Sequence, residues 1–327
     1  AHQDGDRRLV DHRRTCLMAI RPADHGIFAS SAAGGTLGAG YFAGGETAGS
    51  VYVSTVDRFL FADDSRTTLG TGLSATRYNL AGMASSVAGY FGGGNTVSTV
   101  NRFLFADDSR TTIGTGLSSN RRELAAMASP VAGYFGGGND GSSMVTTVDR
   151  FLFSDDSRTT LGTGISLAMV SLMGFASSVA GYFAGGANAS YVMQTTVDRF
   201  LFSNDSRTTL GTGLSAATYR GGGCASPIAG YVGGGYSGGD KDFIDRFLFA
   251  DDTRTTLSSG LSVARRGLAA MASVDAGYFG AGYAGSLNDI VTTVDRFLFS
   301  DDSRTTLGTG LSSTRRNLAA MANAISA

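Results

Sequence analysis

The sequence predicts an all-β fold: a six-bladed β-propeller with four antiparallel strands in each blade. Three observations support this prediction. A motif recurs six times, each copy contains four short segments of strand character, and the chain ends partway through a copy that its beginning completes. Several short strands repeated at a fixed period of this length are typical of propeller blades, whose sheets stack around a central axis.

Two anchors define the repeat. Phe-Leu-Phe follows Asp-Arg or Asn-Arg, and the first residues of these pairs are Asp57, Asn101, Asp149, Asp198, Asp245 and Asp295. Gly-Tyr recurs at Tyr41, Tyr90, Tyr134, Tyr182, Tyr231 and Tyr278. The first five of these Asp or Asn residues each lie 33 residues before the next repeated tyrosine, whereas the opposite interval varies from 11 to 17 residues. The variation in length is therefore confined to one segment of each repeat.

The third copy shows the four expected strands in order. The segment 123–129, ELAAMAS, has side chains small enough for the crowded axis, and VAGYFGGG at 131–138 forms the second strand. TVDRFLF at 147–153 is apolar on both faces, as expected where sheets stack on either side. RTTLGTG at 158–164 is polar enough for the outer edge. Clusters of Gly, Asn, Asp and Ser separate these segments, as turns require.

The two ends of the repeat predict how the ring closes. The chain stops just after a first strand, NLAAMANA, that has no second strand behind it. Tyr41 opens the array with a second strand that has no first strand before it. We expect the C-terminal strand to complete the first blade. The predicted organisation is therefore a non-repeat tail, residues 1–38, followed by a propeller over residues 39–327.

Composition excludes several classes of function. Lysine and arginine number 26 and aspartate and glutamate 27, so no global charge attracts nucleic acid or an anionic membrane. No apolar run is long enough for membrane insertion. Cys16 and Cys224 form neither a disulfide framework nor a metal-site spacing. We expect no metal and no cofactor.

The order of motifs resembles the kelch repeat: a basic residue, LAAMAS, GYFGGG, VDRFLF and then a turn before the fourth strand. The resemblance covers residues 39–327 and is similar in kind to the central propeller of galactose oxidase. It implies a location outside the cell, on a virion or a cell surface, because such arrays occur in phage tail and bacterial surface proteins. The chain departs from the kelch pattern where the tryptophan of the fourth strand is replaced by Leu69, Ile113, Leu161, Leu210, Leu257 and Leu307.

Two charged motifs were considered as sites, and both are interpreted as structural. SDDSRTTL, residues 154–161, resembles the Asp-box turn of sialidases, and we expect Asp156 to accept backbone N–H bonds while Arg158 pairs with a carboxylate. Asp57 and Arg58 are adjacent on a strand and point to opposite faces. They are expected to pair with a neighbouring blade or with the Asp-Asp turn, forming a ladder repeated six times.

The variable segments are the candidate binding site, because a constant scaffold that carries variable loops on one face is a common way to build one. The alternative is that they vary only because exposed loops tolerate change. Arginines in the connections between blades are expected beside these loops, with the alternative that they bond backbone carbonyls. The candidate ligand-binding residues are Tyr52, Tyr191, Tyr236, Tyr283, Arg77, Arg121, Arg265, Arg315, Asp240 and Lys241.

These observations lead to three hypotheses of function. The first is a non-enzymatic binding or adhesion module whose partner is a glycan or a protein receptor. The second is a purely structural subunit that contacts other subunits of a virion or surface assembly. The third is a sialidase-like glycoside hydrolase, which the sequence disfavours because Glu123 is the only glutamate near an arginine-rich loop. A copper site like that of galactose oxidase is also disfavoured, because His2, His12 and His25 all lie in the predicted tail.

Overall fold

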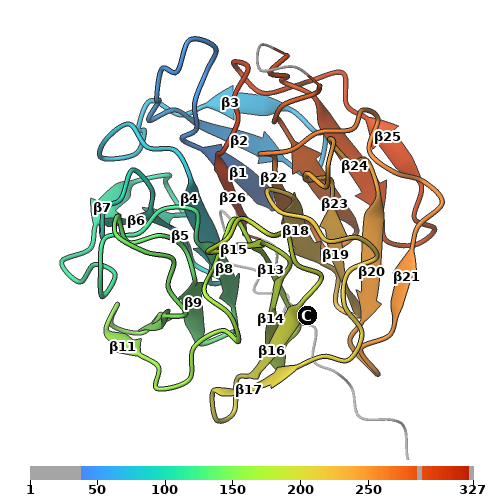
Figure 1. Ribbon diagram of the computed structural model, residues 1–327. Coiled ribbons are helices and arrows are strands. Elements are labelled where there is room, and N and C mark those ends of the chain that lie inside the picture. Colours follow the sequence, from blue (N-terminus) through green and yellow to red (C-terminus); the bar gives the residue numbers. More distant parts are fainter. Residues whose placement is uncertain (1–37, 286–288, 324–327) are drawn as a thin grey trace, which may run out of the picture. The chain divides into compact units, whose positions relative to one another are not determined.

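A computed structural model describes residues 38–285 and 289–323. These residues belong to one compact unit of six four-stranded antiparallel sheets arranged around a central axis (Figure 1). The prediction of a six-bladed β-propeller is confirmed. The predicted tail, residues 1–38, lies outside the described residues except for Gly38. The described residues contain no helix, and so none that could cross a membrane.

Each blade runs from an innermost strand at the axis to an outermost strand at the rim. The innermost strands are β4 Leu80–Ala84, β8 Ala125–Ala128, β13 Met173–Ala176, β18 Gly222–Ala225, β22 Ala269–Ala272 and β26 Ala319–Ala322. The second strands are β1 Ala39–Ala43, β5 Ala88–Gly93, β9 Ala132–Gly136, β14 Ala180–Ala184, β19 Ala229–Gly233 and β23 Ala276–Gly280. The innermost strands contact one another in sequence around the ring, and the second strands are buried along their whole length.

In the outer half of each blade, burial decreases from the third strand to the outermost strand. The third strands are β2 Val56–Leu60, β6 Val100–Leu104, β10 Val148–Leu152, β16 Val197–Leu201, β20 Ile244–Leu248 and β24 Val294–Leu298. The outermost strands are β3 Arg66–Thr68, β7 Arg110–Thr112, β11 Arg158–Thr160, β17 Ser206–Thr209, β21 Arg254–Thr256 and β25 Arg304–Thr306. The two threonines that end each outermost strand are exposed, as predicted for the rim. The sequence does not predict an additional pair, β12 Met169–Val170 with β15 Ala187–Asn188.

The ring closes as predicted. The C-terminal strand β26 pairs antiparallel with β1, with Gly40 opposite Ala322 and Ala43 opposite Ala319. The first blade thus joins the two ends of the described chain.

Neighbouring blades are held together by six apolar clusters, each built from residues of two blades. Within each cluster the repeated tyrosine of one blade stacks on a phenylalanine of the next, as Tyr41 stacks on Phe105 with 5.6 Å between ring centroids. Such aromatic pairs add to the energy of burial itself. The same pair recurs at every interface, including Tyr278 on Phe61 where the ring closes.

The tyrosine hydroxyl also takes part in a polar contact between blades. Tyr41 donates to Asp108 of the second blade at 2.8 Å, and Arg58 pairs with the same carboxylate at 2.5 Å. This tyrosine–arginine–aspartate contact occurs six times, and its acidic members are Asp64, Asp108, Asp156, Asp205, Asp252 and Asp302. The predicted ladder of Asp-Arg motifs between blades is therefore confirmed.

The two aspartates have different roles in the five turns that contain Asp-Asp, and the turn of the fourth blade has Asn204 in place of the first. Asp155 accepts the N–H of Ser157 at 3.0 Å, whereas Asp156 has a positive φ of 57° and reaches Tyr90 and Arg102 of the preceding blade. The expectation that Asp156 caps the turn was wrong, because its left-handed backbone directs its carboxylate away from the turn. Arg158 does pair with a carboxylate, that of Asp149 at 3.6 Å.

Candidate binding surface

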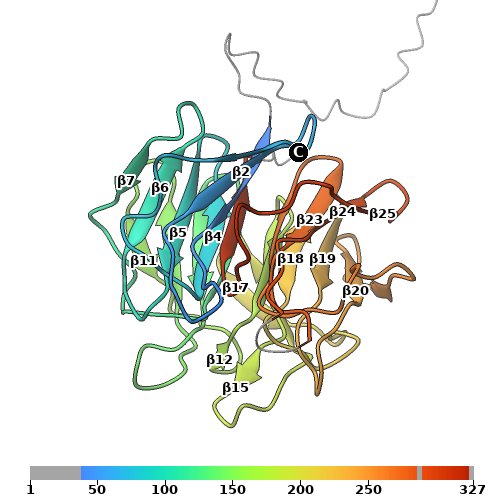
Figure 2. The ribbon, with the colours of Figure 1, turned by 90° about the horizontal axis from the view of Figure 1, so that it is seen from above.

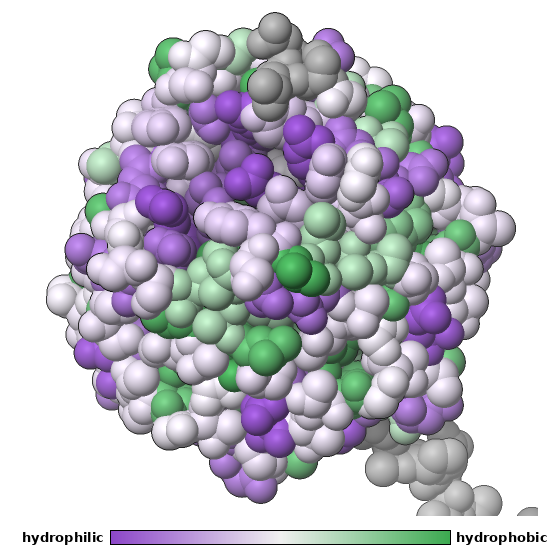
Figure 3. Space-filling view, in the orientation of Figure 1, coloured by the Kyte–Doolittle hydropathy of each residue, from purple (hydrophilic) through white to green (hydrophobic). Residues whose placement is uncertain are grey.

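One face of the ring, here called the loop face, carries the variable segments. They connect the second and third strands, and their described residues are 44–55, 94–99, 137–147, 185–196, 234–243, 281–285 and 289–293. The linkers between blades lie on the same face. The extra pair β12–β15 projects from it (Figure 2). Polar and apolar residues gather on separate parts of this face, with a polar region over the first two blades (Figure 3).

Each variable loop is fixed to the ring at its base. The second glycine of the glycine pair, Gly45 in the first blade, has a φ of 105° and donates its N–H to the carbonyl of Arg77 at 2.7 Å. A side chain at that position would be strained, which explains why glycine stands there. The equivalent bond occurs in all six blades. The loops therefore differ in length and sequence, but all six begin with the same backbone hydrogen bond.

Four candidate arginines lie beneath this surface rather than on it. Arg121 and Arg315 have no exposed area, and their guanidinium groups pair with the buried carboxylates of Asp149 and Asp57. Arg265 pairs with Asp295 at 2.9 Å. Arg121 also donates to the carbonyls of Gly137 and Thr147 at 3.0 Å. These contacts fit the alternative reading, in which the arginines bond backbone carbonyls.

Arg77 occupies the same buried position but has no carboxylate opposite it. Asn101 stands where other blades have aspartate, and it accepts a hydrogen bond from Arg77. Burial lowers the pKa of Arg77 to about 10. Since Arg77, Arg121, Arg265 and Arg315 do not reach the solvent, the candidate binding surface does not include them.

The linkers meet at the axis in a closed ring of backbone hydrogen bonds that the sequence analysis missed. Six residues with positive φ each donate an N–H to the carbonyl of the preceding member, at 2.7 to 3.0 Å: Asn79, Glu123, Ser171, Arg220, Gly267 and Asn317. The side chain of Arg220 crosses this ring to Glu123 at 3.2 Å. The centre of the loop face is therefore closed by backbone hydrogen bonds and carries an ion pair.

The second residues of two of the double arginines, Arg266 and Arg316, were also missed, and they form a cluster with Tyr283. The guanidinium groups of Arg316 and Arg266 lie 4.0 and 4.9 Å from the centre of its ring. Arg316 binds both carboxylate oxygens of Glu46, at 2.7 and 3.1 Å. Burial alone would raise the pKa of Glu46, but these bonds hold it below its ordinary value. Only 5 % of Tyr283 is exposed, so this candidate mainly supports the loops around it.

The candidates of the fifth blade belong to the same cluster. Asp240 pairs with Arg266 and accepts the N–H of Gly285 at 2.9 Å, which links two neighbouring loops. Tyr236 is half-buried, with Arg266 4.8 Å from its ring centre. Lys241 is half-buried, and its ammonium group makes no ion pair within the part of the chain that the structure describes.

Two candidates remain exposed at loop tips. Tyr52 is 37 % exposed and stacks on Tyr78 with 4.2 Å between ring centroids, next to the exposed Val51. Tyr191 is 70 % exposed, has a φ of 56°, and is followed by the exposed Val192. These two valine–tyrosine pairs belong to loops of the first and fourth blades, on opposite sides of the ring.

No group of three or more His, Cys, Asp or Glu that could hold a metal ion is found among residues 38–285 and 289–323. No family model matches the chain, and no curated protein matches its sequence.

Proposed function

We propose that the propeller is a non-enzymatic binding module that recognises a glycan or a protein through its loop face, within a virion or surface assembly and by kelch-like repeats. One observation carries this proposal. The repeated tyrosines and the arginines and aspartates that they meet are held in contacts between blades, whereas the apolar side chains exposed at the loop tips come from segments that differ between copies. Exposed aromatic and aliphatic groups on a rigid base are a common source of binding energy in recognition surfaces.

The geometry of the two tips supports simultaneous contact with one large ligand. Val51 with Tyr52, and Tyr191 with Val192, lie on opposite sides of the axial ring of hydrogen bonds, so a ligand that contacts both pairs must span this ring. The φ of 56° at Tyr191 is costly for a bulky residue, and such strain is often found at functional positions.

The test is capture of ligands by the full chain on a glycan array and in a pull-down. Tyr52→Ser combined with Tyr191→Ser should reduce capture at least about tenfold, since each removes an aromatic anchor. Thr67→Ser with Thr208→Ser, on the exposed outermost strands of the same two blades, is the matched control and should not change it. Equal capture by both double variants would contradict the proposal.

The hydrolase alternative has less support. Glu46 and Glu123, the two glutamates of the chain, are each engaged by an arginine, Arg316 and Arg220. Measurable turnover of a sialoside would favour this alternative. The purely structural alternative predicts that the tip variants leave every interaction of the chain unchanged.

A further inference from the structure

The face opposite the loop face, here called the turn face, carries an apolar collar. It is formed by the short turns between the first and second strands of five blades. Its members are Val87, Val131, Val179, Ile228 and Val274, with 64, 69, 63, 69 and 50 % of their surface exposed. Valine or isoleucine at the same turn of five blades places aliphatic groups around the axis, and the described part of the chain leaves them exposed.

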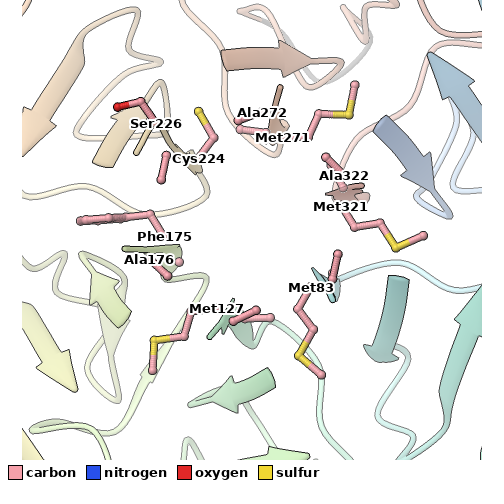
Figure 4. Close-up of a pocket in the computed structure, with 18 of the residues that line it drawn as sticks. Met83, Met127, Phe175, Ala176, Cys224, Ser226, Met271, Ala272, Met321 and Ala322 are labelled. Atoms are coloured by element: carbon pink, nitrogen blue, oxygen red, sulfur yellow. The ribbon is translucent and has the colours of Figure 1, made fainter. Parts of the chain in front are cut away.

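The collar surrounds the entrance of a cavity of about 200 Å³ on the axis. Its walls are small residues of the innermost strands, such as Ala84, Ala128 and Ala176, and Pro130 and Pro227 lie at its edge. The larger side chains of these strands, among them Met83 and Met321, turn away from the opening and into the blade interfaces (Figure 4). Serines also line it, among them Ser177, Ser226 and Ser273, and its volume is enough for one aliphatic side chain.

A set of carboxylates lies outside the collar. The first aspartate of the Asp-Asp turn is exposed in five blades, at Asp63, Asp107, Asp155, Asp251 and Asp301, and Asp275 is exposed beside Val274. The hydrogen bond from Ser65 holds the pKa of Asp63 below its ordinary value, so that carboxylate stays ionised. The second aspartate of each turn is already neutralised by an arginine of the preceding blade. The charge left uncompensated around the collar is therefore negative.

We propose that the turn face docks a protein segment that presents one aliphatic side chain between basic residues. The aliphatic group enters the axial cavity and covers the collar, and the arginines or lysines beside it face the carboxylates of Asp107, Asp155 and Asp301. Charge complementarity favours this partner over a second copy of the chain placed face to face, because two acidic rims would repel each other. It also disfavours nucleic acid and anionic lipid. This site is independent of the function proposed for the loop face.

Fluorescent nine-residue peptides and the full chain provide the test, with binding followed by anisotropy. The probe has a central leucine between two arginine pairs, and its controls replace that leucine by serine or the arginines by glutamates. We expect the leucine probe to bind at least about tenfold more tightly than the serine peptide, as burial of a leucine side chain implies. A rise from low to physiological salt should weaken it a few-fold, and the glutamate peptide should not bind.

Variants locate the site. Val131→Ser with Ile228→Ser should weaken binding of the leucine probe at least about fivefold, and Asp107→Asn with Asp155→Asn should weaken it about threefold. Val263→Ser, an exposed valine of the loop face, is the matched control and should leave binding unchanged. Three results would overturn the proposal: no binding of the leucine probe at millimolar concentration, equal binding of the leucine and serine peptides, or collar variants that bind like the wild type.

Discussion

The guanidinium group of Arg315 pairs with the carboxylate of Asp57 across 258 residues of sequence, and neither side chain has any exposed surface. Arg315 lies in the linker that leads to the last strand, and Asp57 lies in the third strand of the first blade. The same guanidinium donates to the carbonyls of Gly44 and Thr55 at 3.0 and 3.1 Å. One buried arginine therefore ties the last linker to the first blade.

Removing this arginine should destabilise the ring strongly. Arg315→Met leaves the buried carboxylate of Asp57 with only the longer 3.6 Å contact to Arg66, and we expect the free energy of unfolding to fall by about 3–5 kcal/mol. Urea denaturation followed by tyrosine fluorescence measures the loss. Adding Asp57→Asn removes that buried charge and should restore a substantial part of it. If Arg315→Met alone unfolds at the wild-type urea concentration, the buried pair does not hold the ring closed.

The interface between the first two blades offers the reverse experiment. Arg77 is buried opposite the neutral Asn101, so Asn101→Asp should supply the missing carboxylate and raise the free energy of unfolding by about 1–2 kcal/mol at pH 7. The new carboxylate would have a pKa below its ordinary value. Its contribution is therefore present at neutral pH and lost on acidification. Asn204→Asp, at an exposed turn, is the matched control and should change stability by less than about 0.5 kcal/mol. A destabilised Asn101→Asp variant would contradict this reasoning.

The fold could be predicted from the sequence because the same pattern of strand segments recurs six times. The constant spacing of Asp57 from Tyr90 and its five equivalents predicted the blades, and the unmatched first strand at the C-terminus predicted the closure. The pairing of Asp57 and Arg58 with different partners followed from the alternation of side chains along a strand.

The candidate site was less predictable, because burial is a property of the assembled ring. The two arginines at 121 and 122 look alike in sequence, yet the first is buried and the second half-exposed since adjacent residues point in different directions. A signal was present, because Arg121 and Arg315 recur in register with Asp149 and Asp57. No comparable signal exists for the contact of Arg316 with Tyr283, because the loops that bring them together differ in every copy.

Stability should depend on pH at both extremes. Burial alone would raise the pKa of Asp57, but the charge of Arg315 and hydrogen bonds from Thr68 and Ser312 hold it below its ordinary value. The stability from such a group is present above the pKa of the unfolded chain, about 4, and is lost as pH falls further. Asp149 and Asp295 behave in the same way, so the acid limb should be steep.

The alkaline limb comes from the tyrosines between blades. Burial, followed by the charge of Asp302, raises the pKa of Tyr231 to about 12, and the other five repeated tyrosines shift in the same direction. Their stabilising effect is complete below the ordinary pKa of about 10 and is lost as pH rises above it. Thermal unfolding midpoints should thus be level between about pH 5 and 9 and fall on both sides. A midpoint that keeps rising from pH 9 to 11 would be incompatible with these contacts.

The loss of stability on replacing the glycine before a repeated tyrosine should depend on the atoms that the new Cβ would meet. A Cβ at Gly89 would stand 1.8 Å from the Sδ atom of Met321, and one at Gly230 would stand 2.0 Å from the ring of Phe175. At Gly277 the nearest atom is the Sγ of Cys224, at 2.8 Å. None of the three has a positive φ, so the cost of an added methyl group is steric rather than conformational.

We therefore expect a graded series of alanine variants. Gly230→Ala should cost the most, because an aromatic ring cannot bend away. Gly89→Ala should cost about 1–3 kcal/mol. Gly277→Ala should cost the least of the three, because its Cβ would lie farthest from its nearest neighbour and the lost backbone freedom of the unfolded chain offsets part of the strain. Urea midpoints at unchanged m-value measure the three. Met321→Ala combined with Gly89→Ala should cost less than the sum of the single changes, because the shortened side chain makes room for the methyl group. Strict additivity of these two changes would show that the methionine is not what excludes a side chain at position 89.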